Sequence, residues 1–370
     1  MADANDNPLT YSTSGVDYSS IDPAKVSAQA AAAKTASNLN AFNMTEVTAS
    51  RGESAYVWQE GDAHRALVVE GLGTKNLVAD AMRAIGGKTY YDQIAQDTVA
   101  MIVNDLIVVG ALPNVINAYF AIGDSAWMND QERTGDLIRG WAAACDLSGA
   151  TWGGGETPAL KGIINPETID LAGSAIGSIA PGQLVLGDNL SDGDAIILVE
   201  SSGIHANGLT LARSIADQQP DGYATKLSDG RMYGEALLTP TRIYVALVRE
   251  LLQKNIDIHY MVNITGHGWR KLMRATKDFT YVMNVIPEVP TELTFIKEQA
   301  NIDDTEMYGN FNMGAGFAIY IPQSEVPAVL EAAKQVNFKA WQAGMVTAGP
   351  KKVIIEPANI TFDGASLGVR

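Results

Sequence analysis

The sequence predicts an α/β protein with two domains. The chain has 370 residues, which is more than one hydrophobic core usually holds. From Ala66 onward, short apolar runs alternate with helical patterns. Residues 180–194, rich in Gly, Asp and Pro, interrupt this alternation near the middle of the chain. We therefore expect an N-terminal arm and helix over residues 1–40, an N-terminal domain over 41–185, and a C-terminal α/β domain, a sheet flanked by helices, over 186–370.

The individual elements follow from local patterns. Asp22 suits a helix N-cap and Pro23 a first helical position, so the alanine-rich run after them predicts a helix. Residues 99–110 place Val99, Ile102 and Leu106 on one helical stripe. Further helices are predicted over residues 76–85, 131–145, 209–216, 240–252 and 325–336. Strands are predicted over residues 66–69, 115–121, 169–179, 195–200, 315–321 and 353–355. Glycines punctuate the strand at 169–179, which permits close backbone approach.

Composition excludes several classes of function. The formal net charge of −16 argues against nucleic acid or an anionic membrane surface as partner, because both need a basic face. Cys145 is the single cysteine, so no intrachain disulfide can form, and its small-residue surroundings predict a buried core thiol. The chain opens on polar, acidic residues rather than a signal peptide, and no apolar run is long enough to span a membrane. We therefore expect a cytoplasmic protein.

The chemistry concentrates between residues 67 and 113. LVVEGLGTK predicts a strand that breaks into a Gly-x-Gly turn and ends at Lys75, an arrangement that suits a phosphate tail. IAQDTVAMIVNDLIVVGALP predicts a buried helix that contains Asp97 and Asp105. A carboxylate in an apolar run is costly unless it is paired or binds a metal. Together these residues suggest an ATP–magnesium site, with a capped or salt-bridged structural acid as the alternative for Asp105.

Two more glycine-rich segments could bind anions. In GGGETP, three glycines free backbone amides, and Glu156 could bind metal or nucleotide; the alternative is a tight turn with a surface glutamate. In SSGIHANG, His205 and Asn207 lie where the amides of a helix N-terminus would attract a phosphate or carboxylate. We expect Lys75, Asp105 and Glu156 to converge on one site.

Taken in order, the motifs resemble those of one enzyme family. They are GLGTK, VAMIVNDLIVVGALP, GGET, SSGIHANG, LTPTRIY, NITGHG and EMYGNFNMGAG, with an early YSTSGVD at residues 11–17. This order resembles the aminoimidazole ribonucleotide synthetase family, also called phosphoribosylformylglycinamidine cyclo-ligase, over nearly the whole chain. VNDLIV with GGET is typical of the wider ATP-binding superfamily. LTPTRIY and EMYGNFNMGAG point to this family within it.

The resemblance implies a fold, a partner and a reaction. The sheets of two N-terminal domains would pair in a homodimer and form a β-barrel, with ATP near that interface. The family uses ATP, with Mg²⁺, to phosphorylate the amide oxygen of formylglycinamidine ribonucleotide, a small phosphorylated ribonucleotide. An amidine nitrogen then closes the imidazole ring, giving aminoimidazole ribonucleotide, ADP and phosphate in purine synthesis. Such chemistry needs positioning and charge neutralisation more than a covalent nucleophile.

The resemblance also implies roles for individual residues. Catalytic roles would belong to Lys75, Asp105 and His205. ATP would contact Gly71, Gly73, Thr74, Lys75, Asp97, Asn104, Asp105, Gly154, Gly155 and Glu156. The metal ligands would be Glu70, Asp105 and Glu156. The ribonucleotide would contact Ser202, His205, Asn207, Thr241 and Arg242.

Four departures from the family pattern leave other functions open. Glu70 replaces the usual aspartate before the Gly-x-Gly turn, and residues 41–60 lack the usual glycine-rich loop. Asn263 and His267 replace a histidine and a glycine of the usual His-x-Thr-Gly-Gly-Gly. The usual Glu-Met-Pro after GGET is also absent. The alternatives are another ATP-using enzyme of the superfamily, a kinase or ligase on a different small substrate, and a non-catalytic nucleotide-binding homodimer.

Overall fold

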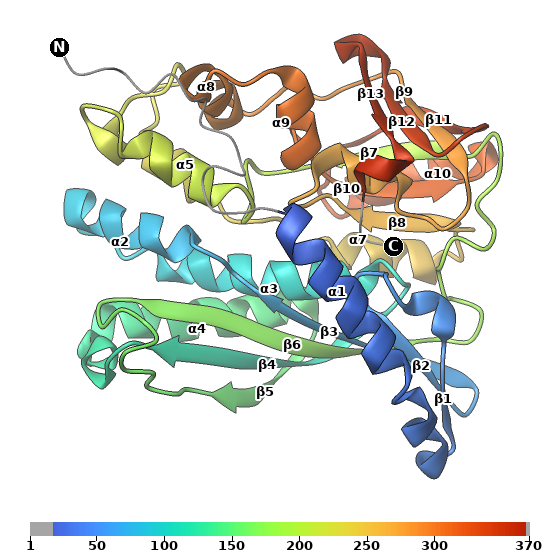
Figure 1. Ribbon diagram of the computed structural model, residues 1–370, viewed down its shortest axis with the longest axis horizontal. Helices are drawn as coiled ribbons and strands as arrows, with labels where there is room; N and C mark the ends of the chain where they lie inside the picture. Colours follow the sequence, from blue (N-terminus) through green and yellow to red (C-terminus); the bar gives the residue numbers. More distant parts are fainter. Residues whose placement is uncertain (1–17, 368–370) are drawn as a thin grey trace.

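Two mixed β-sheets, one in each half of the chain, organise the computed structural model (Figure 1). The structure describes residues 18–367, so the YSTSGVD match at 11–17 lies outside the described residues. The N-terminal sheet has the order β1-β2-β3-β6-β4-β5, and its pairs are antiparallel except for the parallel pair of β4 with β5. Its strands are β1 (Met44–Glu46), β2 (Tyr56–Glu60), β3 (Ala63–Gly71), β4 (Leu112–Ile122), β5 (Thr151–Glu156) and β6 (Ile169–Ile179).

Helices cover one face of this sheet. They are α2 (Lys75–Gly86), α3 (Tyr91–Ile107) and α4 (Gln131–Ser148). Alternate residues of β6 are buried under α3, which is the pattern of a sheet with one covered face. The glycines of β6 permit this close packing, as the sequence predicted. A Cβ on Gly173 would lie 2.7 Å from Cδ1 of Ile102, and a Cβ on Gly177 would lie 2.9 Å from Cδ2 of Leu106.

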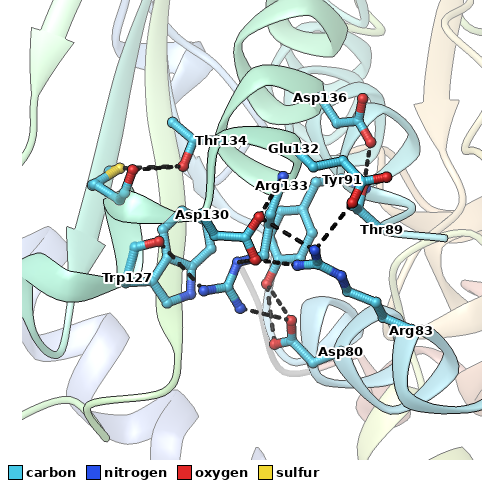
Figure 2. Close-up of polar contacts among 11 residues, drawn as sticks. Asp80, Arg83, Thr89, Tyr91, Trp127, Asp130, Glu132, Arg133, Thr134 and Asp136 are labelled. Atoms are coloured by element: carbon cyan, nitrogen blue, oxygen red, sulfur yellow. Dashed lines mark hydrogen bonds and ion pairs between the residues drawn. The ribbon is translucent and has the colours of Figure 1, made fainter. Parts of the chain in front are cut away.

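A polar network joins α2, α3 and α4 at one end of the N-terminal domain (Figure 2). Arg83 forms an ion pair with Asp130, the N-cap residue of α4. Arg133 donates to Asp80 at 3.3 Å, and its guanidinium carbon lies 4.1 Å from the centroid of a Trp127 ring. The hydroxyl of Tyr91 lies 3.1 Å from both carboxylate oxygens of Asp80. These contacts fix the three helices relative to one another.

The C-terminal domain is built on a sheet of order β13-β12-β9-β11-β7-β10-β8, antiparallel except for the pair of β12 with β9. Its strands are β7 (Ala195–Glu200), β8 (Tyr260–Asn263), β9 (Phe279–Met283), β10 (Ala315–Ile321), β11 (Ala340–Ala348), β12 (Lys352–Ile355) and β13 (Ile360–Asp363). Its helices are α5 (Leu209–Ala216), α6 (Tyr233–Leu237), α7 (Val245–Gln253), α8 (Thr291–Ala300), α9 (Asp304–Asn310) and α10 (Val326–Gln335).

Short 3-10 helices connect these elements: η1 (Ala36–Phe42), η2 (Thr48–Ser50), η3 (Ser125–Asn129), η4 (Gly222–Ala224), η5 (Gly268–Met273), η6 (Gln323–Glu325), η7 (Glu356–Ala358) and η8 (Gly364–Ser366). Near the N-terminus, α1 (Tyr18–Ala33) runs across the front of the view in Figure 1, and its residues 23–33 are all exposed. Within residues 18–367, no helix is long and apolar enough to cross a membrane.

Helix α3 lies between the N-terminal sheet and the C-terminal domain (Figure 1). It contacts β3 and β6 on one side and α7 and β8 on the other. Every residue from Asp97 to Ile107 is therefore buried, whereas the sequence predicted a single buried stripe. The helix also begins earlier than predicted, at Tyr91, and ends at Ile107 rather than Gly110. The reason for both differences is tertiary, since the second domain covers the face that a lone domain would expose to water.

Two other segments differ in conformation from the prediction. The helix predicted over residues 240–252 begins only at Val245, because residues 239–244 instead lie along α3 and hydrogen-bond to it through their backbone. The glycine run at 153–155, predicted as a turn, belongs to edge strand β5. Its glycines serve strand pairing, since a Cβ on Gly155 would lie 2.1 Å from the carbonyl oxygen of Ala118 on β4.

Candidate active site along helix α3

Several polar residues of α3 contact the C-terminal domain. Gln96 Nε2 donates to the carbonyl of Thr241 at 3.0 Å, and Asn104 Nδ2 donates to the carbonyl of Arg242 at 2.7 Å. Asn104 Oδ1 also accepts from the backbone N–H of Tyr244 at 2.9 Å. Buried polar groups of this kind require partners, and here the partners are backbone groups more than 130 positions away in the sequence.

Lys75 and Asp97 form an ion pair in which both side chains are fully buried. The Lys75 Nζ lies 2.9 Å from Asp97 Oδ1 and also donates to the backbone carbonyls of His205 and Thr239, each at 2.9 Å. The carboxylate of Asp97 also accepts from the backbone N–H of Thr241 at 2.8 Å and from the Thr241 hydroxyl. Burial lowers the pKa of Lys75 and raises the pKa of Asp97. The charge of Asp97 opposes the shift of Lys75, and the charge of Lys75 opposes the shift of Asp97.

The three N–H groups of the Lys75 ammonium therefore have three acceptors within the chain. A phosphate could reach Lys75 only after one of these bonds breaks. Asp97 is likewise occupied by Lys75 and Thr241 rather than open to a metal. Asp97 is therefore a buried acid neutralised by an ion pair, which is one of the two possibilities that the sequence left open for such an acid.

His205 lies in the turn that follows β7. Its backbone has φ +64°, and its side chain is buried. The imidazole Nε2 accepts from the backbone N–H of Ser202 at 3.2 Å, which requires a neutral ring nitrogen. Burial lowers the pKa of His205 to about 3, and the charges of Lys75 and Arg242 act in the same direction. His205 is therefore neutral at physiological pH.

A second polar cluster lies further along α3, around Asp105. Asp105 Oδ1 accepts from Asn263 Nδ2 of β8 at 2.7 Å, and both residues are buried. Glu70, near the end of β3, has its pKa raised to about 7, first by burial and then by the charge of Asp105. Lys271 of η5 is buried nearby, and burial lowers its pKa to about 8 against the charges of Asp105 and Glu70. Two carboxylates and one ammonium thus meet where the two domains adjoin.

The sequence reasoning missed Lys271 and two residues that hold a neighbouring loop. Arg274 donates to the carbonyl of Gly52 at 2.8 Å and to the hydroxyl of Ser54 at 3.0 Å. The Tyr260 hydroxyl donates to the carboxylate of Glu53 at 2.9 Å. Residues 52–54, which precede β2, are therefore fastened to the C-terminal domain. The basic run WRKLMR after NITGHG was the available signal, because buried cations require acidic partners.

The predicted substrate residues lie together on two turns of the C-terminal domain. Ser202 donates its hydroxyl to the carbonyl of Pro240, so the turn at 201–208 rests against residues 239–244. Arg242 pairs with Glu200 at 2.8 Å, and its buried Nε has no hydrogen-bond partner among the described residues. Among the residues that the structure describes, Asn207 Nδ2 makes only a 3.8 Å contact with the sulfur of Met101. Asn207 and Arg242 therefore have polar groups that could bind a ligand, whereas Thr241 is already hydrogen-bonded to Asp97.

Glu156 lies apart from these residues. It is exposed at the end of edge strand β5, and its own carboxylate accepts from the backbone N–H of Thr157 at 3.2 Å. Register across the sheet aligns Glu70 with Gly173, then Ala118, then Gly155. Three strand spacings separate β3 from β5, which is about 14 Å.

Lys75, Asp105 and Glu156 therefore do not converge within one chain, although the sequence predicted that they would. Lys75 contacts Asp97, and Asp97 lies eight residues before Asp105 on α3, about 12 Å along the helix axis. Glu156 and the neighbouring Gly154 and Gly155 lie on β5, at the far edge of the sheet. Local sequence patterns indicated each residue as a candidate, but the fold places the three on different elements: α2, α3 and β5.

The turn before α2 fits a nucleotide. The Thr74 hydroxyl is buried with no hydrogen-bond partner among residues 18–367. Gly73 has φ +76° and open space where a Cβ would lie, while Gly71 packs loosely on β6. A ligand that brings its own oxygens would satisfy Thr74.

The described residues contain no group of three or more His, Cys, Asp or Glu side chains placed to hold a metal. Magnesium suits this arrangement, since it often takes one or two carboxylates and fills its remaining positions with phosphate oxygens and water.

Comparisons with known proteins agree with the motifs. The model of the AIR synthase related protein N-terminal domain matches residues 52–179, and that of the C-terminal domain matches residues 191–356. The phosphoribosylformylglycinamidine cyclo-ligase of Methanothermobacter thermautotrophicus is 34% identical over 352 residues, 94% of this chain and 97% of that protein.

Solved structures share the fold at low identity. A HypE–HypF complex matches with a TM-score of 0.60 and 18% identity, covering 84% of this chain and 92% of that chain. The hydrogenase maturation protein HypE in complex with ATP matches with a TM-score of 0.54 and 18% identity, covering 73% of this chain and 78% of that chain.

Proposed function

Because this chain belongs to the AIR synthase related family, we propose that it is an ATP-dependent cyclo-ligase that converts formylglycinamidine ribonucleotide to aminoimidazole ribonucleotide. One structural observation supports the proposal independently of the relative's name. The fold brings three residues to one place between the domains: Glu70, which directly precedes GLGTK, Asp105 of VNDLIV and Asn263 of NITGHG. Carboxylates held beside each other in a buried site are suited to a magnesium–triphosphate complex.

The residues around this cluster divide into two groups. On the nucleotide side we assign the turn at 71–74, with the Thr74 hydroxyl available for a phosphate oxygen, and Glu70 and Asp105 as magnesium ligands. Bound Mg–ATP would supply the phosphoryl group that activates the amide oxygen. On the substrate side, Asn207 and Arg242 would hold the ribonucleotide, and neutral His205 would shape the turn that carries Asn207.

A homodimer completes the proposal. Leu67, Ile176 and Val115 lie directly opposite one another on three adjacent strands of the N-terminal sheet, on the face opposite α3. They are 36%, 44% and 38% exposed, and Val69 on the same face of β3 is 70% exposed. A row of apolar side chains on an open sheet face is typical of an interaction surface. A second copy pairing there would form a barrel and would cover the face next to β5, where Glu156 lies.

A second candidate is a kinase or ligase that acts on a different small substrate. The buried Lys271 beside Glu70 and Asp105 favours it, because an extra ammonium changes which charges the site can accept. The sequence departures at Glu70, Asn263 and His267 lie in the same region.

Turnover separates the candidates. Purified protein is incubated with Mg–ATP and formylglycinamidine ribonucleotide, and aminoimidazole ribonucleotide and ADP are quantified. Formation of both in equal amounts supports the cyclo-ligase. ADP formation only with other acceptors supports the second candidate. If nucleotide binds and no acceptor is turned over, the protein is a non-catalytic nucleotide-binding homodimer and the enzymatic proposal is wrong.

A further inference from the structure

The buried Lys75 ammonium joins three separate segments of the chain. Lys75 is the first residue of α2 and directly follows the turn at 71–74. Its three acceptors come from α3, through Asp97, and from two turns of the C-terminal domain, through the carbonyls of His205 and Thr239. The side chain is fully buried, so water does not compete for these bonds.

The two backbone acceptors belong to the turns that carry the proposed substrate contacts. His205 lies two residues before Asn207, and Thr239 lies three residues before Arg242. Asp97 binds the second turn again through the backbone N–H of Thr241 at 2.8 Å. Lys75 and Asp97 therefore hold both turns against α3 at once.

The conformation of the first turn makes this support necessary. His205 has φ +64°, a left-handed conformation that few residues other than glycine adopt without support from their surroundings. The Ser202 hydroxyl donates to Pro240, so movement of one turn moves the other. A carbonyl that accepts from a buried ammonium is costly to release, because both the charge and the carbonyl would lose their partners.

From these contacts we propose that Lys75 is a positioning residue that couples the nucleotide-side turn at 71–74 to the two substrate turns. It acts on ribonucleotide binding through the main chain of His205 and Thr239 and does not contact a phosphate. The identity of the bound ribonucleotide rests on the proposed function. The coupling of the turns through Lys75 does not depend on it.

The test uses a charge-neutral double variant, Lys75→Met with Asp97→Asn. Removing Lys75 alone would leave Asp97 buried and unpaired, which could unfold the protein. The amide oxygen of the introduced asparagine can still accept from Thr241, so the double variant removes chiefly the ammonium's bonds to His205 and Thr239. Arg249→Met is the matched control, since Arg249 also donates across the domain boundary, to the carbonyl of Ser148 at 3.1 Å, but touches neither turn.

Three measurements are made on the full chain: hydrogen exchange of peptides covering 201–208 and 238–243, affinity for Mg with a non-hydrolysable ATP analogue, and KM for each substrate. We expect faster exchange in both peptides and a ribonucleotide KM raised about tenfold or more, as for lost ground-state positioning. Affinity for the ATP analogue should change less than about threefold, well under the tenfold step that 1.4 kcal/mol represents.

Two results would overturn the inference. One is a loss of analogue affinity of tenfold or more with unchanged exchange, which would place Lys75 on a phosphate. The other is an equal effect from Arg249→Met, which would show general loosening of the domains. If the wild-type protein does not turn over formylglycinamidine ribonucleotide, the proposed function fails, but exchange and analogue binding still decide the role of Lys75.

A milder variant covers the case in which the double variant does not fold. Thr241→Val removes the hydroxyl that donates to Asp97 and leaves Lys75 in place. Exchange of the 238–243 peptide should rise with it and analogue affinity should not fall. Unchanged exchange in that peptide would contradict the coupling.

Discussion

Asn104 on α3 makes a two-way hydrogen-bonded contact with the segment that ends at Tyr244. The amide nitrogen of Asn104 donates to the carbonyl of Arg242 at 2.7 Å, and its amide oxygen accepts from the backbone N–H of Tyr244 at 2.9 Å. Asn104 and Tyr244 are buried and Arg242 is partly buried, so water has little access to either bond. One amide side chain thus satisfies two backbone groups of the other domain.

Asn104→Ala should destabilise the protein strongly. It leaves one buried carbonyl and one buried N–H without partners, and each loss costs about 1–3 kcal/mol. We expect a loss of roughly 2–4 kcal/mol in the free energy of unfolding, measured by urea denaturation. Gln93→Ala, on a half-buried position of the same helix, is the control and should change stability by less than about 1 kcal/mol. Equal losses in the two variants would contradict the role assigned to Asn104.

His205 should make the protein sensitive to acid. Its pKa is about 3 in the folded chain and 6.5 when unperturbed, so between these values the unfolded chain binds more protons. Stability must then fall as pH drops through this window, by up to about 1.4 kcal/mol per pH unit. His205→Asn removes the titrating group, and asparagine tolerates the left-handed backbone.

We therefore expect the wild type to lose about 2 kcal/mol more stability than His205→Asn between pH 6.5 and 5, measured by urea denaturation at each pH. Parallel pH profiles for the two proteins would show that protonation of His205 is not what destabilises the fold in acid.

Asp105→Asn should abolish turnover and preserve the fold. Asparagine can still accept from Asn263, whose amide lies 2.7 Å from Asp105 Oδ1, but it lacks the charge for a magnesium ion. We expect kcat/KM to fall by about 100-fold or more, while the circular dichroism spectrum and melting temperature stay close to wild type. Asp146→Asn, an exposed position on α4, is the control and should keep full activity. Normal turnover by the Asp105 variant would make Asp105 a structural residue only.

The network in Figure 2 should matter for stability rather than for catalysis. Arg133→Met removes the bond to Asp80 at 3.3 Å and the contact with Trp127. We expect a loss of about 1–3 kcal/mol, since the side chain of Arg133 is only 14% exposed. Arg139→Met breaks an ion pair whose arginine is 71% exposed, and it should cost less than about 1 kcal/mol. Both values come from urea denaturation, and the same loss in both variants would contradict this ranking.

Ile176→Lys should break the proposed homodimer. Ile176 lies between Leu67 and Val115 in the exposed apolar row, so a charge there would be buried in the interface. Light scattering coupled to gel filtration should give a dimer for the wild type and a monomer for the variant. Ile163→Lys changes an exposed isoleucine outside the sheet and should leave the mass unchanged. A wild-type protein that is monomeric at micromolar concentration would refute the dimer.

Local patterns predicted several elements with their observed bounds. Strands β6, β7 and β10 and helix α5 begin and end at the predicted residues. These segments are bounded by glycine, proline or acidic turns, and their apolar spacing is unambiguous. The helix predicted over 240–252 begins five residues late, at Val245. Its helical spacing extends to Tyr244, but hydrogen bonds to α3 hold residues 239–244 in another conformation. A tertiary partner overrode a local preference.

Of the candidate site, the sequence predicted the polar residues but not their partners. It marked Asp97 and Asp105 as acids that need compensation and left open whether a metal or an ion pair supplies it. The structure pairs Asp97 with Lys75 and places Asp105 beside Asn263 and Glu70. Lys271 and Arg274 were missed because their roles depend on groups more than 150 positions earlier in the chain: the charges of Glu70 and Asp105 for Lys271, and the carbonyl of Gly52 for Arg274.

By itself, then, the sequence determined the family, the α/β class and the need to neutralise the charges buried in α3, because motif order, hydrophobic period and the cost of burying an ion are all local properties. Only the tertiary structure decided which group neutralises each charge and that Glu156 lies apart from Lys75 and Asp105. Those outcomes depend on contacts between segments far apart in the sequence, such as Asp105 with Asn263, and no local spacing records them.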